Sequence, residues 1–442
     1  TNWSYYSHYV GDIFGAPLAI EALMAFFLES TLFGLFFFGW DRLSKEKHLA
    51  VTWLMALATN LSALWILVAN GWMQHPVGSV FNIDTMRMEL TSFADVLLNP
   101  VAQVKFVHTV SAGYVTGAIF VLAISSWYLL KGRDLAFARR SFAIASAFGL
   151  ASALSVIVLG DESGYELGDV QKVKLAAVEA EWHTHPAPAA FTVFGIPDRE
   201  AEKTDYALKI PAVLGLIATR SLDEEVTGLS DLKKQHLERI IRGQEAYVLL
   251  QQYRAGDKSA ATAERFNQLS DDLGYGMLLT AYTDDVANAT NEQIAQAVED
   301  SIPAVGPLFW SFRLMVACGV SMLVLFTLAF WHSARRTVQK PRWLLKFALF
   351  SLPLPWLACE AGWFVAEYGR QPWAIGEILP THMAVSQLTV TDIWISLGSI
   401  MVLYTIFVII EMWLMTKYAR LGPSSLHTGK YDLETPAGAK EA

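Results

Sequence analysis

The sequence predicts an all-α, polytopic transmembrane protein, a helical bundle with one large loop domain outside the membrane. Three observations carry this prediction. Of the 442 residues, 53% are hydrophobic and only 17% are charged, whereas soluble domains are about 25% charged. The chain contains seven apolar runs, each long enough to cross a bilayer, for which about 20 residues suffice. One long polar connection separates the fourth run from the fifth.

The composition also argues against other classes of protein. The net charge is −9, so the chain is not expected to bind nucleic acid. The 15 tryptophans are typical of a protein with aromatic anchors at the membrane surface. Both cysteines fall in apolar runs, and neither a disulfide framework nor a Cys-x-x-Cys metal motif is present. Membrane lipid is therefore the expected surrounding of the chain.

The apolar runs divide the chain into four regions. The predicted spans cover roughly residues 14–40, 48–70, 104–130, 141–160, 307–331, 343–367 and 391–416. The regions are residues 1–160 with the first four helices, 161–306 with the loop domain, 307–420 with the last three helices, and 421–442 as a tail. The tail is polar and charged after Leu421, and it is predicted to be disordered.

Basic residues alternate between connections and predict the orientation. They follow the first, third, fifth and seventh runs: Arg42, Lys45, Lys47, Lys131, Arg133, Arg139, Arg140, Arg335, Arg336, Lys340, Arg342, Lys417 and Arg420. Because cytoplasmic loops carry an excess of Lys and Arg, these connections are expected inside. The loop domain is then outside, and the C-terminus is cytoplasmic.

Four segments at or inside the loop domain have a recognisable pattern. Residues 171–181 and 230–255 have apolar side chains at helical spacing and predict a short helix and a long one. Residues 160–166 are predicted to be rich in turns, and residues 256–270 are predicted to be a loop.

Two carboxylates mark the outer part of the sixth predicted helix. Glu360 and Glu367 are seven residues apart, which is about two turns, so both lie on one face. Trp363 lies between them and is a candidate electron relay. Arg370 follows, and Pro372 ends the helix because it has no backbone donor. An acid in lipid is costly unless it is paired or used, so the stretch predicts a functional site at a membrane surface.

Two further carboxylates occupy the first predicted helix. Glu21 lies about two turns into it, and Glu29 follows eight residues later, close to the same face. A single membrane carboxylate can simply form a hydrogen bond between helices. Carboxylate pairs in two different helices favour a proton path or a cofactor pocket.

An imidazole and a thioether occur at matching predicted depth. His108 is about one turn from the outer end of the third helix, and Met315 is about two turns from the outer end of the fifth. Each residue alone is usually part of the packed core. Together they form a known axial pair for haem iron, in which the thioether raises the reduction potential. Arg313 could neutralise a haem propionate, or it could extend to the outer surface.

Lys174 and Glu179 lie five residues apart on the short helix at the start of the loop domain. One interpretation of this pair is a solvated helix face. The other is a polar clamp for a head group that enters from the lipid.

Five short segments carry a family resemblance. The most specific is Gly369-Arg370-Gln371-Pro372-Trp373. The others are Gly71-Trp72-Met73-Gln74, Phe106-Val107-His108-Thr109, Gly160-Asp161-Glu162-Ser163-Gly164-Tyr165-Glu166 and Phe312-Arg313-Leu314-Met315-Val316-Ala317-Cys318-Gly319. With these segments the chain resembles subunit I of the cytochrome bd quinol oxidases. The resemblance runs from Thr1 into the tail, so it covers nearly the whole chain.

The resemblance implies three haems: a low-spin haem b, a high-spin haem b, and a haem d at which dioxygen is reduced. His108 and Met315 match the axial ligands of the low-spin haem, and Arg313 matches the arginine beside it. Glu367 matches the ligand of the high-spin haem b, and Trp363 matches an aromatic residue between the haems.

Other positions match the oxygen, proton and quinol sites of the family. Glu21 matches a glutamate at the haem d site. Glu29 and Ser62 match members of a proton path from the inner side. Lys174 and Glu179 match quinol-binding positions in the outer loop, which is called the Q-loop and is of the long type here. Since the sixth helix runs outward, Arg370 lies near the level expected for the haems and is a candidate partner of a propionate.

The family resemblance also sets expectations for what accompanies the chain. Family members have nine spanning helices, and the first of two additional N-terminal helices carries a histidine that ligates the iron of haem d. Because the sequence begins at Thr1, we expect this segment to be missing and that ligand to be absent. Subunit II and a small single-helix subunit are the expected partners. The expected location is the bacterial inner membrane, with the Q-loop in the periplasm.

The favoured hypothesis is a terminal quinol oxidase. Ubiquinol or menaquinol would be oxidised near the outer surface, and dioxygen would be reduced to water with protons drawn from inside along Glu29. A proton-coupled transporter would also explain the membrane carboxylates, but it would not explain His108 and Met315 at one depth. A third possibility is a catalytically incomplete fragment that keeps only the low-spin haem.

Overall fold

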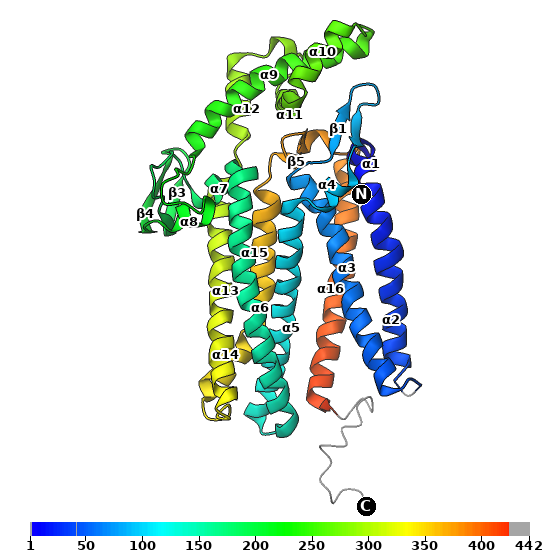
Figure 1. Cartoon of the computed structure of the whole chain (residues 1–442), viewed down its shortest axis with the longest axis vertical. Coiled ribbons are helices and arrows are strands. Elements are labelled where there is room, and N and C mark those ends of the chain that lie inside the picture. Colours follow the sequence, from blue (N-terminus) through cyan, green and yellow to red (C-terminus); the bar gives the residue numbers. More distant parts are fainter. Residues whose placement is uncertain (1, 41, 424–442) are drawn as a thin grey trace, which may run out of the picture.

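The computed structural model describes residues 2–40 and 42–423, and these are mostly helical (Figure 1). Among them, six helices are long and apolar enough to cross a membrane, and a bent helix pair makes a seventh span. The spanning segments are α1–η1–α2 (Ser4–Ile20, Glu21–Phe26 and Phe27–Phe38), α3 (Lys45–Gln74), α5 (Pro100–Lys131), α6 (Leu135–Val170), α13 (Val305–Ala334), α14–α15 (Arg342–Phe350 and Leu354–Tyr368) and α16 (Val390–Leu421). The predicted number of spans is confirmed. The predicted tail lies outside the described residues from 424 onward.

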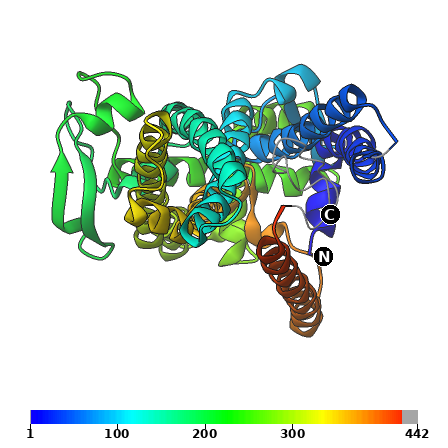
Figure 2. The same cartoon turned by 90° about the horizontal axis from the view of Figure 1, so that it is seen from below.

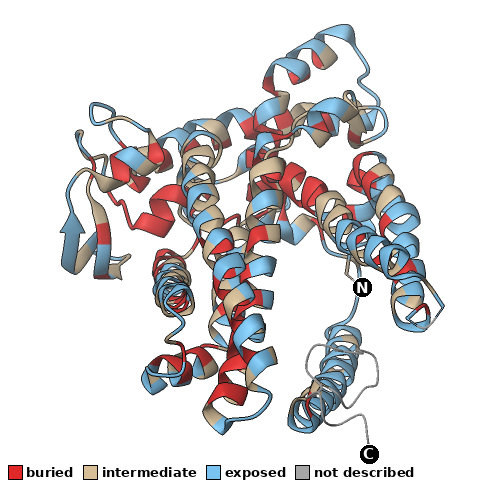
Figure 3. Ribbon diagram, turned by 60° about the horizontal axis from the view of Figure 1, so that its bottom comes forward, coloured by how far each residue is buried: buried red, intermediate tan, exposed pale blue. Residues whose placement is uncertain are grey.

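The spans form two packed groups. Helices α5, α6, α13, α14 and α15 surround an apolar core that includes Leu122, Phe142 and Phe326, each fully buried. Helices α1, α2 and α3 pack together as the second group. Buried residues line the inner faces of both groups, while the outer faces are exposed (Figure 3). This pattern suits helices whose outer surface contacts lipid.

Helix α16 stands apart from both groups (Figure 1 and Figure 2). Within residues 390–421, all of which are described, no side chain is buried. The C-terminal end of α16 accepts hydrogen bonds at the carbonyls of Ala419, from Tyr128 at 2.7 Å, and Arg420, from Arg133 at 2.9 Å. A helix that is apolar on every side belongs in lipid or against another apolar protein.

An outer domain covers one end of the bundle (Figure 1). Between α6 and α13 it contains α7 (Lys172–Glu179), β3 (Phe191–Asp198), β4 (Lys203–Ile210), α8 (Val213–Ala218), α9 (Leu229–Ala255), α10 (Ala260–Leu269), η2 (Ser270–Asp272), α11 (Leu273–Leu278), η3 (Leu279–Ala281), η4 (Val286–Asn288) and α12 (Asn291–Asp300). Shorter connections add β1 (Ser79–Asn82), β2 (Arg87–Leu90), α4 (Phe93–Leu97), β5 (Trp373–Ile375), β6 (Leu379–Pro380) and η5 (Thr381–Met383). The strands pair as antiparallel hairpins, β1 with β2, β3 with β4, and β5 with β6.

The predicted turns at residues 160–166 are wrong, because α6 continues through them to Val170. Glycine here serves close packing rather than turning. A Cβ atom on Gly164 would lie 2.9 Å from Cγ2 of Ile217, so the helix meets the following part of the outer domain at this point.

The predicted loop at residues 256–270 is wrong as well, because it contains α10. Ser259 caps this helix by accepting a hydrogen bond from the backbone N–H of Thr262 at 3.2 Å. The helix buries Phe266. The predicted helices at 171–181 and 230–255 correspond to α7 and α9.

Two spanning segments are not regular helices. The first contains a π-helix that begins at Glu21, and such wide turns are rare and often occur at functional sites. The sixth bends by 41° between α14 and α15, so the prediction of one continuous helix over 343–367 is wrong. Pro353 and Pro355 lie at the bend, where their missing backbone donors interrupt the helical hydrogen bonds.

Candidate functional site

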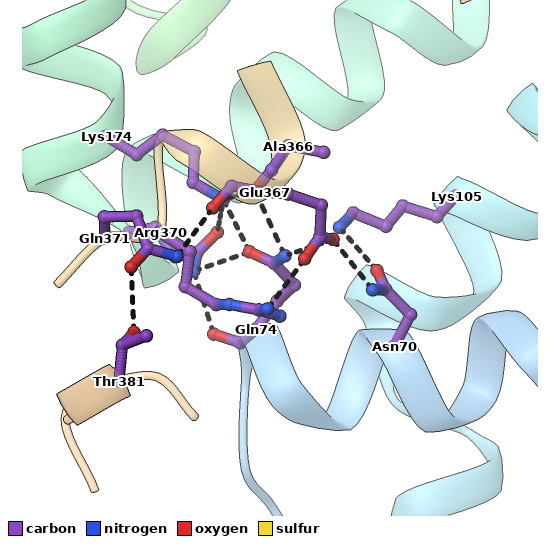
Figure 4. A network of polar contacts seen from close by, with 10 residues as sticks. Asn70, Gln74, Lys105, Lys174, Ala366, Glu367, Arg370, Gln371 and Thr381 are labelled. Atoms are coloured by element: carbon purple, nitrogen blue, oxygen red, sulfur yellow. Dashed lines mark hydrogen bonds and ion pairs between the residues drawn. The ribbon is translucent and has the colours of Figure 1, made fainter. Parts of the chain in front are cut away.

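Glu367 is the centre of a polar network at the ends of the spanning helices that face the loop domain (Figure 4). Its carboxylate accepts hydrogen bonds from Asn70 Nδ2 at 2.8 Å and from Gln74 Nε2 at 3.4 Å. These two donors are four residues apart, so one face of α3 presents both. Arg370 Nη2 donates to the other carboxylate oxygen at 2.6 Å. The carboxylate is therefore held between α3 and the end of α15.

Two lysines extend this network. Lys105 Nζ donates to Asn70 Oδ1 at 3.2 Å, and Lys174 Nζ donates to Gln74 Oε1. Lys174 is buried, and this burial lowers the pKa of Lys174 well below its usual value, with Lys105 and Arg370 adding repulsion. Three basic side chains thus lie around one carboxylate, an arrangement that favours the binding of a further anionic group.

Arg370 has donors that the protein leaves unused. Its side chain is buried, and among the described residues Nε and Nη1 have no hydrogen-bond partner. The hydroxyl of Tyr6 is buried and unpaired in the same way. A buried unpaired donor costs about 1–3 kcal/mol. A carboxylate such as a haem propionate would pair with this guanidinium, so the residues present fit the predicted role of Arg370.

A cavity of ≈ 460 Å³ lies between α7, α9 and the β5–β6 hairpin. Lys174, Arg370, His236 and Trp373 all contribute to its wall. Burial lowers the pKa of His236 to about 4, so this imidazole is neutral at physiological pH. The cavity has the size of small-molecule sites, about 300–1,000 Å³, and it has the Glu367 network at its base.

A second network joins the other end of α7 to α13. Arg313 Nη2 donates to Glu179 Oε2 at 2.8 Å, and the remaining donors bind the carbonyls of Thr192, Val178 and Phe309. Burial raises the pKa of Glu179, and Arg313 offsets only part of this increase. Arg313 is 9% exposed, so it does not extend to the outer surface. In this arrangement, all three nitrogens of the Arg313 guanidinium already donate hydrogen bonds to protein acceptors.

The structure separates the two predicted quinol-binding residues. Lys174 belongs to the Glu367 network and Glu179 to the Arg313 network, so α7 connects both. Each side chain is 3% exposed, so the alternative interpretation of a solvated helix face is wrong.

His108 and Met315 both lie against glycines of neighbouring helices. A Cβ atom on Gly160 of α6 would lie 3.5 Å from His108 Cε1, and one on Gly362 of α15 would lie 2.8 Å from Met315 Sδ. The Nδ1 atom of His108 is buried and has no hydrogen-bond partner among the described residues. A buried imidazole whose Nδ1 atom is unpaired and a thioether in one helix bundle fit axial ligation of a haem iron.

Glu21 and Ser62 are in direct contact. Ser62 Oγ donates to Glu21 Oε1 at 2.9 Å, which joins the π-helix to α3. Glu29 lies eight residues further along the same span and is partly buried. Glu21 of the predicted haem d site and Ser62 of the predicted proton path are thus brought together, and Glu29 lies further along the same span.

Trp363 and Glu360 are not part of the Glu367 network. The side chain of Trp363 is 49% exposed in the isolated chain, and Glu360 is also exposed. Both therefore face lipid, a bound group or another subunit. The predicted relay role of Trp363 stays a prediction.

The sequence pattern did not indicate the partners that hold these groups. Asn70, Gln74 and Lys105 were missed, although a lysine within an apolar run is a signal that could have indicated Lys105. Glu181 was also missed. It is 2% exposed, and its Oε2 lies 3.4 Å from Nε2 of His185. Burial raises the pKa of Glu181 to about 7.

The raised pKa of Glu181 predicts a pH-dependent stability. The value in the folded state lies above the usual 4.5, so the stabilisation is present below about pH 4.5 and is lost as the pH rises to about 7. We expect the free energy of unfolding of the wild type to fall by up to about 3 kcal/mol over this range relative to that of Glu181→Gln. Chemical unfolding at pH 5 and pH 8 measures this difference. The exposed Glu200→Gln is the control, and equal pH dependence in both variants would contradict the prediction.

Comparison with known proteins identifies the family of the chain. The family model for cytochrome bd terminal oxidase subunit I matches residues 1–423. Over 428 residues the chain is 56% identical to cytochrome bd-II ubiquinol oxidase subunit 1 of Escherichia coli (strain K12), which covers 97% of this chain and 83% of that relative.

Two further relatives agree with this match. Cytochrome bd ubiquinol oxidase subunit 1 of Bacillus subtilis (strain 168) is 33% identical over 433 residues, which are 98% of this chain and 80% of that relative. The bd oxidase structure from Geobacillus thermodenitrificans has the same fold, with a TM-score of 0.73 at 23% identity, over 96% of this chain and 82% of that one. The chain therefore belongs to the cytochrome bd terminal oxidase subunit I family.

Proposed function

We propose that this terminal oxidase subunit oxidises ubiquinol at the outer face of the membrane and passes the electrons to dioxygen. The observation that carries the proposal is the position of α7. Lys174 at one end of this helix reaches the Glu367 network, and Glu179 at the other end binds Arg313, two residues before Met315. A quinol bound beside α7 would thus be close to both candidate haem sites. Family membership favours this function over a proton-coupled transporter.

The cavity above Glu367 suits the quinol head group. Lys174 Nζ also donates to Gln171 Oε1 at 2.8 Å and to the carbonyl of Ala366 at 3.0 Å, so its position is fixed before any ligand binds. A fixed buried lysine stabilises the negative charge that develops on a quinol oxygen as a proton leaves. Relatives named as ubiquinol oxidases at 56% and 33% identity support ubiquinol over menaquinol, which a 23% identical relative names.

The proposed cofactors are a low-spin haem b, a high-spin haem b and haem d, which supply one-electron transfer and oxygen reduction when bound. His108 and Met315 would hold the low-spin haem, and Glu367 the high-spin haem b. Arg370 would bind a propionate through its unpaired Nε and Nη1. Trp363 would lie between the haems.

Protons for oxygen reduction would come from the inner side. Glu29 would receive them, and Glu21 would deliver them at the haem d site, with Ser62 holding the Glu21 carboxyl through their 2.9 Å hydrogen bond. Protons from quinol would leave on the outer side. Because uptake and release occur on opposite sides, the reaction would charge the membrane.

The proposed location is the bacterial inner membrane, with the Q-loop in the periplasm and the C-terminus in the cytoplasm. The proposed partners are subunit II and a small single-helix subunit. The surface of α16, on which the described residues bury no side chain, supports a partner, because such an apolar helix would be covered by another apolar chain or by lipid.

Lys174→Gln tests the quinol site. We expect the KM for ubiquinol to rise about tenfold to a hundredfold, because a hydrogen bond to a charged group contributes about 1.5–3 kcal/mol. Oxygen consumption by the complete complex, driven by ubiquinol, measures this. The matched control is Lys233→Gln, whose ion pairs with Glu202 and Glu299 lie elsewhere in the outer domain. An unchanged KM would contradict the assignment. A low-spin haem spectrum without any oxygen consumption in wild type would instead indicate the incomplete fragment.

A further inference from the structure

The β3–β4 hairpin presents an apolar face that the other described residues cover only in part. Phe194 pairs with Leu208, and residues directly opposite each other lie on the same face. Ile210 is two residues from Leu208, so it shares that face, and Ile196 extends it along β3. These four side chains are 47–63% exposed.

This exposure is unfavourable in water. Burying a large apolar side chain is worth about 1.5–3 kcal/mol, and here four such side chains are left half exposed on one small hairpin. A two-stranded hairpin alone is marginally stable at best in water. Contiguous exposed apolar patches mark sites of interaction with protein or membrane. The hairpin therefore has a partner surface.

The position of the hairpin relative to α13 sets its depth. Both Arg313 Nε and Arg313 Nη2 donate to the carbonyl of Thr192, so β3 is attached directly to a spanning helix. The ring of Phe194 lies 5.3 Å from the ring of Trp310, which is 41% exposed. Trp310 is five residues into α13, or about 8 Å along its axis. Tryptophans near the ends of spanning helices lie at the level of the lipid head groups.

The hairpin also lies beside the bundle rather than above it. Seen from the inner end of the bundle, β3 and β4 are in open view beyond α13, with no spanning helix in front of them (Figure 2). Their apolar face continues the exposed outer face of α13, where Leu314 is 49% exposed. Lys209 is exposed on β4, where it can reach acidic or zwitterionic head groups, while Lys203 forms an ion pair with Asp205 at 3.1 Å.

We propose that the β3–β4 hairpin lies in the outer leaflet of the membrane and anchors the loop domain to lipid. The lipid-facing surface of α13 then extends without interruption onto Phe194, Ile196, Leu208 and Ile210. The anchor holds Thr192 against Arg313 and so supports the Glu179 end of α7. This role concerns lipid contact, and it does not depend on which quinol or haem the subunit binds.

Depth-dependent quenching tests the anchor. The complete complex carries Leu208→Cys in a Cys318→Ala, Cys359→Ala background, is labelled with a fluorophore, and is placed in phosphatidylcholine–phosphatidylglycerol nanodiscs. Quenching by nitroxide on the lipid acyl chain is compared with quenching by iodide in water. Phe194→Cys is the second position. Ile241→Cys on α9 is the matched control, because Ile241 is an apolar side chain of the same domain with 52% exposure.

We expect acyl-chain nitroxide to quench the labels at Leu208 and Phe194 at least about threefold more than the label at Ile241, with iodide showing the reverse order. Equal quenching by iodide at all three positions would overturn the proposal. A label at Leu208 protected from both quenchers would also overturn it, because another protein chain would then cover the hairpin. Haem absorbance of each variant establishes that the complex is assembled, so neither outcome depends on quinol oxidation.

Discussion

Replacing His108 with alanine is expected to abolish the low-spin b-type absorbance while leaving a folded membrane protein. The imidazole is the stronger of the two proposed axial ligands, and no other group of α5 at this position can take its place. Its Nδ1 has no hydrogen-bond partner among the described residues, so the substitution removes no internal contact at that atom. Reduced-minus-oxidised spectra of the purified complex measure the result.

Substitutions at or beside Met315, the other proposed ligand, should change the low-spin haem without abolishing its signal. Met315→Leu keeps the volume but removes the sulfur, so the reduction potential of the low-spin haem should fall. Gly362→Val should act in the same direction, because even its Cβ would lie 2.8 Å from Met315 Sδ and would displace that side chain. His332→Ala is the control for His108. His332 lies at the inner end of α13 and bonds Thr337 at 2.9 Å. An intact low-spin spectrum in His108→Ala would refute the ligand assignment.

The depth of the candidate ligands could be predicted from the sequence because it depends on counting along apolar runs. The seven spans follow from hydropathy, and with them the positions of His108 and Glu367 near helix ends on the side of the loop domain. The breaks in these helices were not predicted. The bend beside Pro353 and the π-helix at Glu21 depend on how each helix packs, although a proline pair inside an apolar run was a visible signal.

The partners of the polar groups could not be predicted in the same way. Lys174 binds Gln74, which is 100 residues away in sequence, and Glu367 binds Asn70, which is 297 residues away. No local pattern connects such positions. Arg313 illustrates the same limit. An arginine near a helix end is expected to extend outward, but here Thr192 of a distant strand covers it.

Glu367→Ala is expected to have the largest effect on both stability and cofactor content. The substitution removes the carboxylate that lies among the three basic side chains of this network, and it leaves the donors of Asn70 and Gln74 without this acceptor. Breaking a buried ion pair costs about 3–5 kcal/mol. Since Glu367 is 27% exposed while Arg370 is 6% exposed, we expect a loss near the lower end, about 3 kcal/mol.

Absorption spectra should show whether Glu367 ligates iron or only balances the charge of its basic neighbours. Glu367→Ala and Glu367→Gln should both lose the high-spin haem b signal and keep the low-spin one, because neither variant offers a carboxylate to iron. Glu367→Gln should recover part of the stability, because an amide still accepts from Asn70. Adding Arg370→Met to Glu367→Gln should stabilise that variant further, since one uncompensated cation is removed.

This double-mutant cycle identifies what the network does. A coupling energy of about 1–3 kcal/mol between positions 367 and 370 is expected for two side chains in direct contact. If the network serves only packing and charge balance, the high-spin signal will follow stability alone and will return with it in the double variant. If Glu367 ligates iron, the double variant will regain stability without regaining the high-spin haem b. Retention of that signal in Glu367→Ala would show that the ligand lies elsewhere, and it would leave the outer end of α15 with an electrostatic role alone.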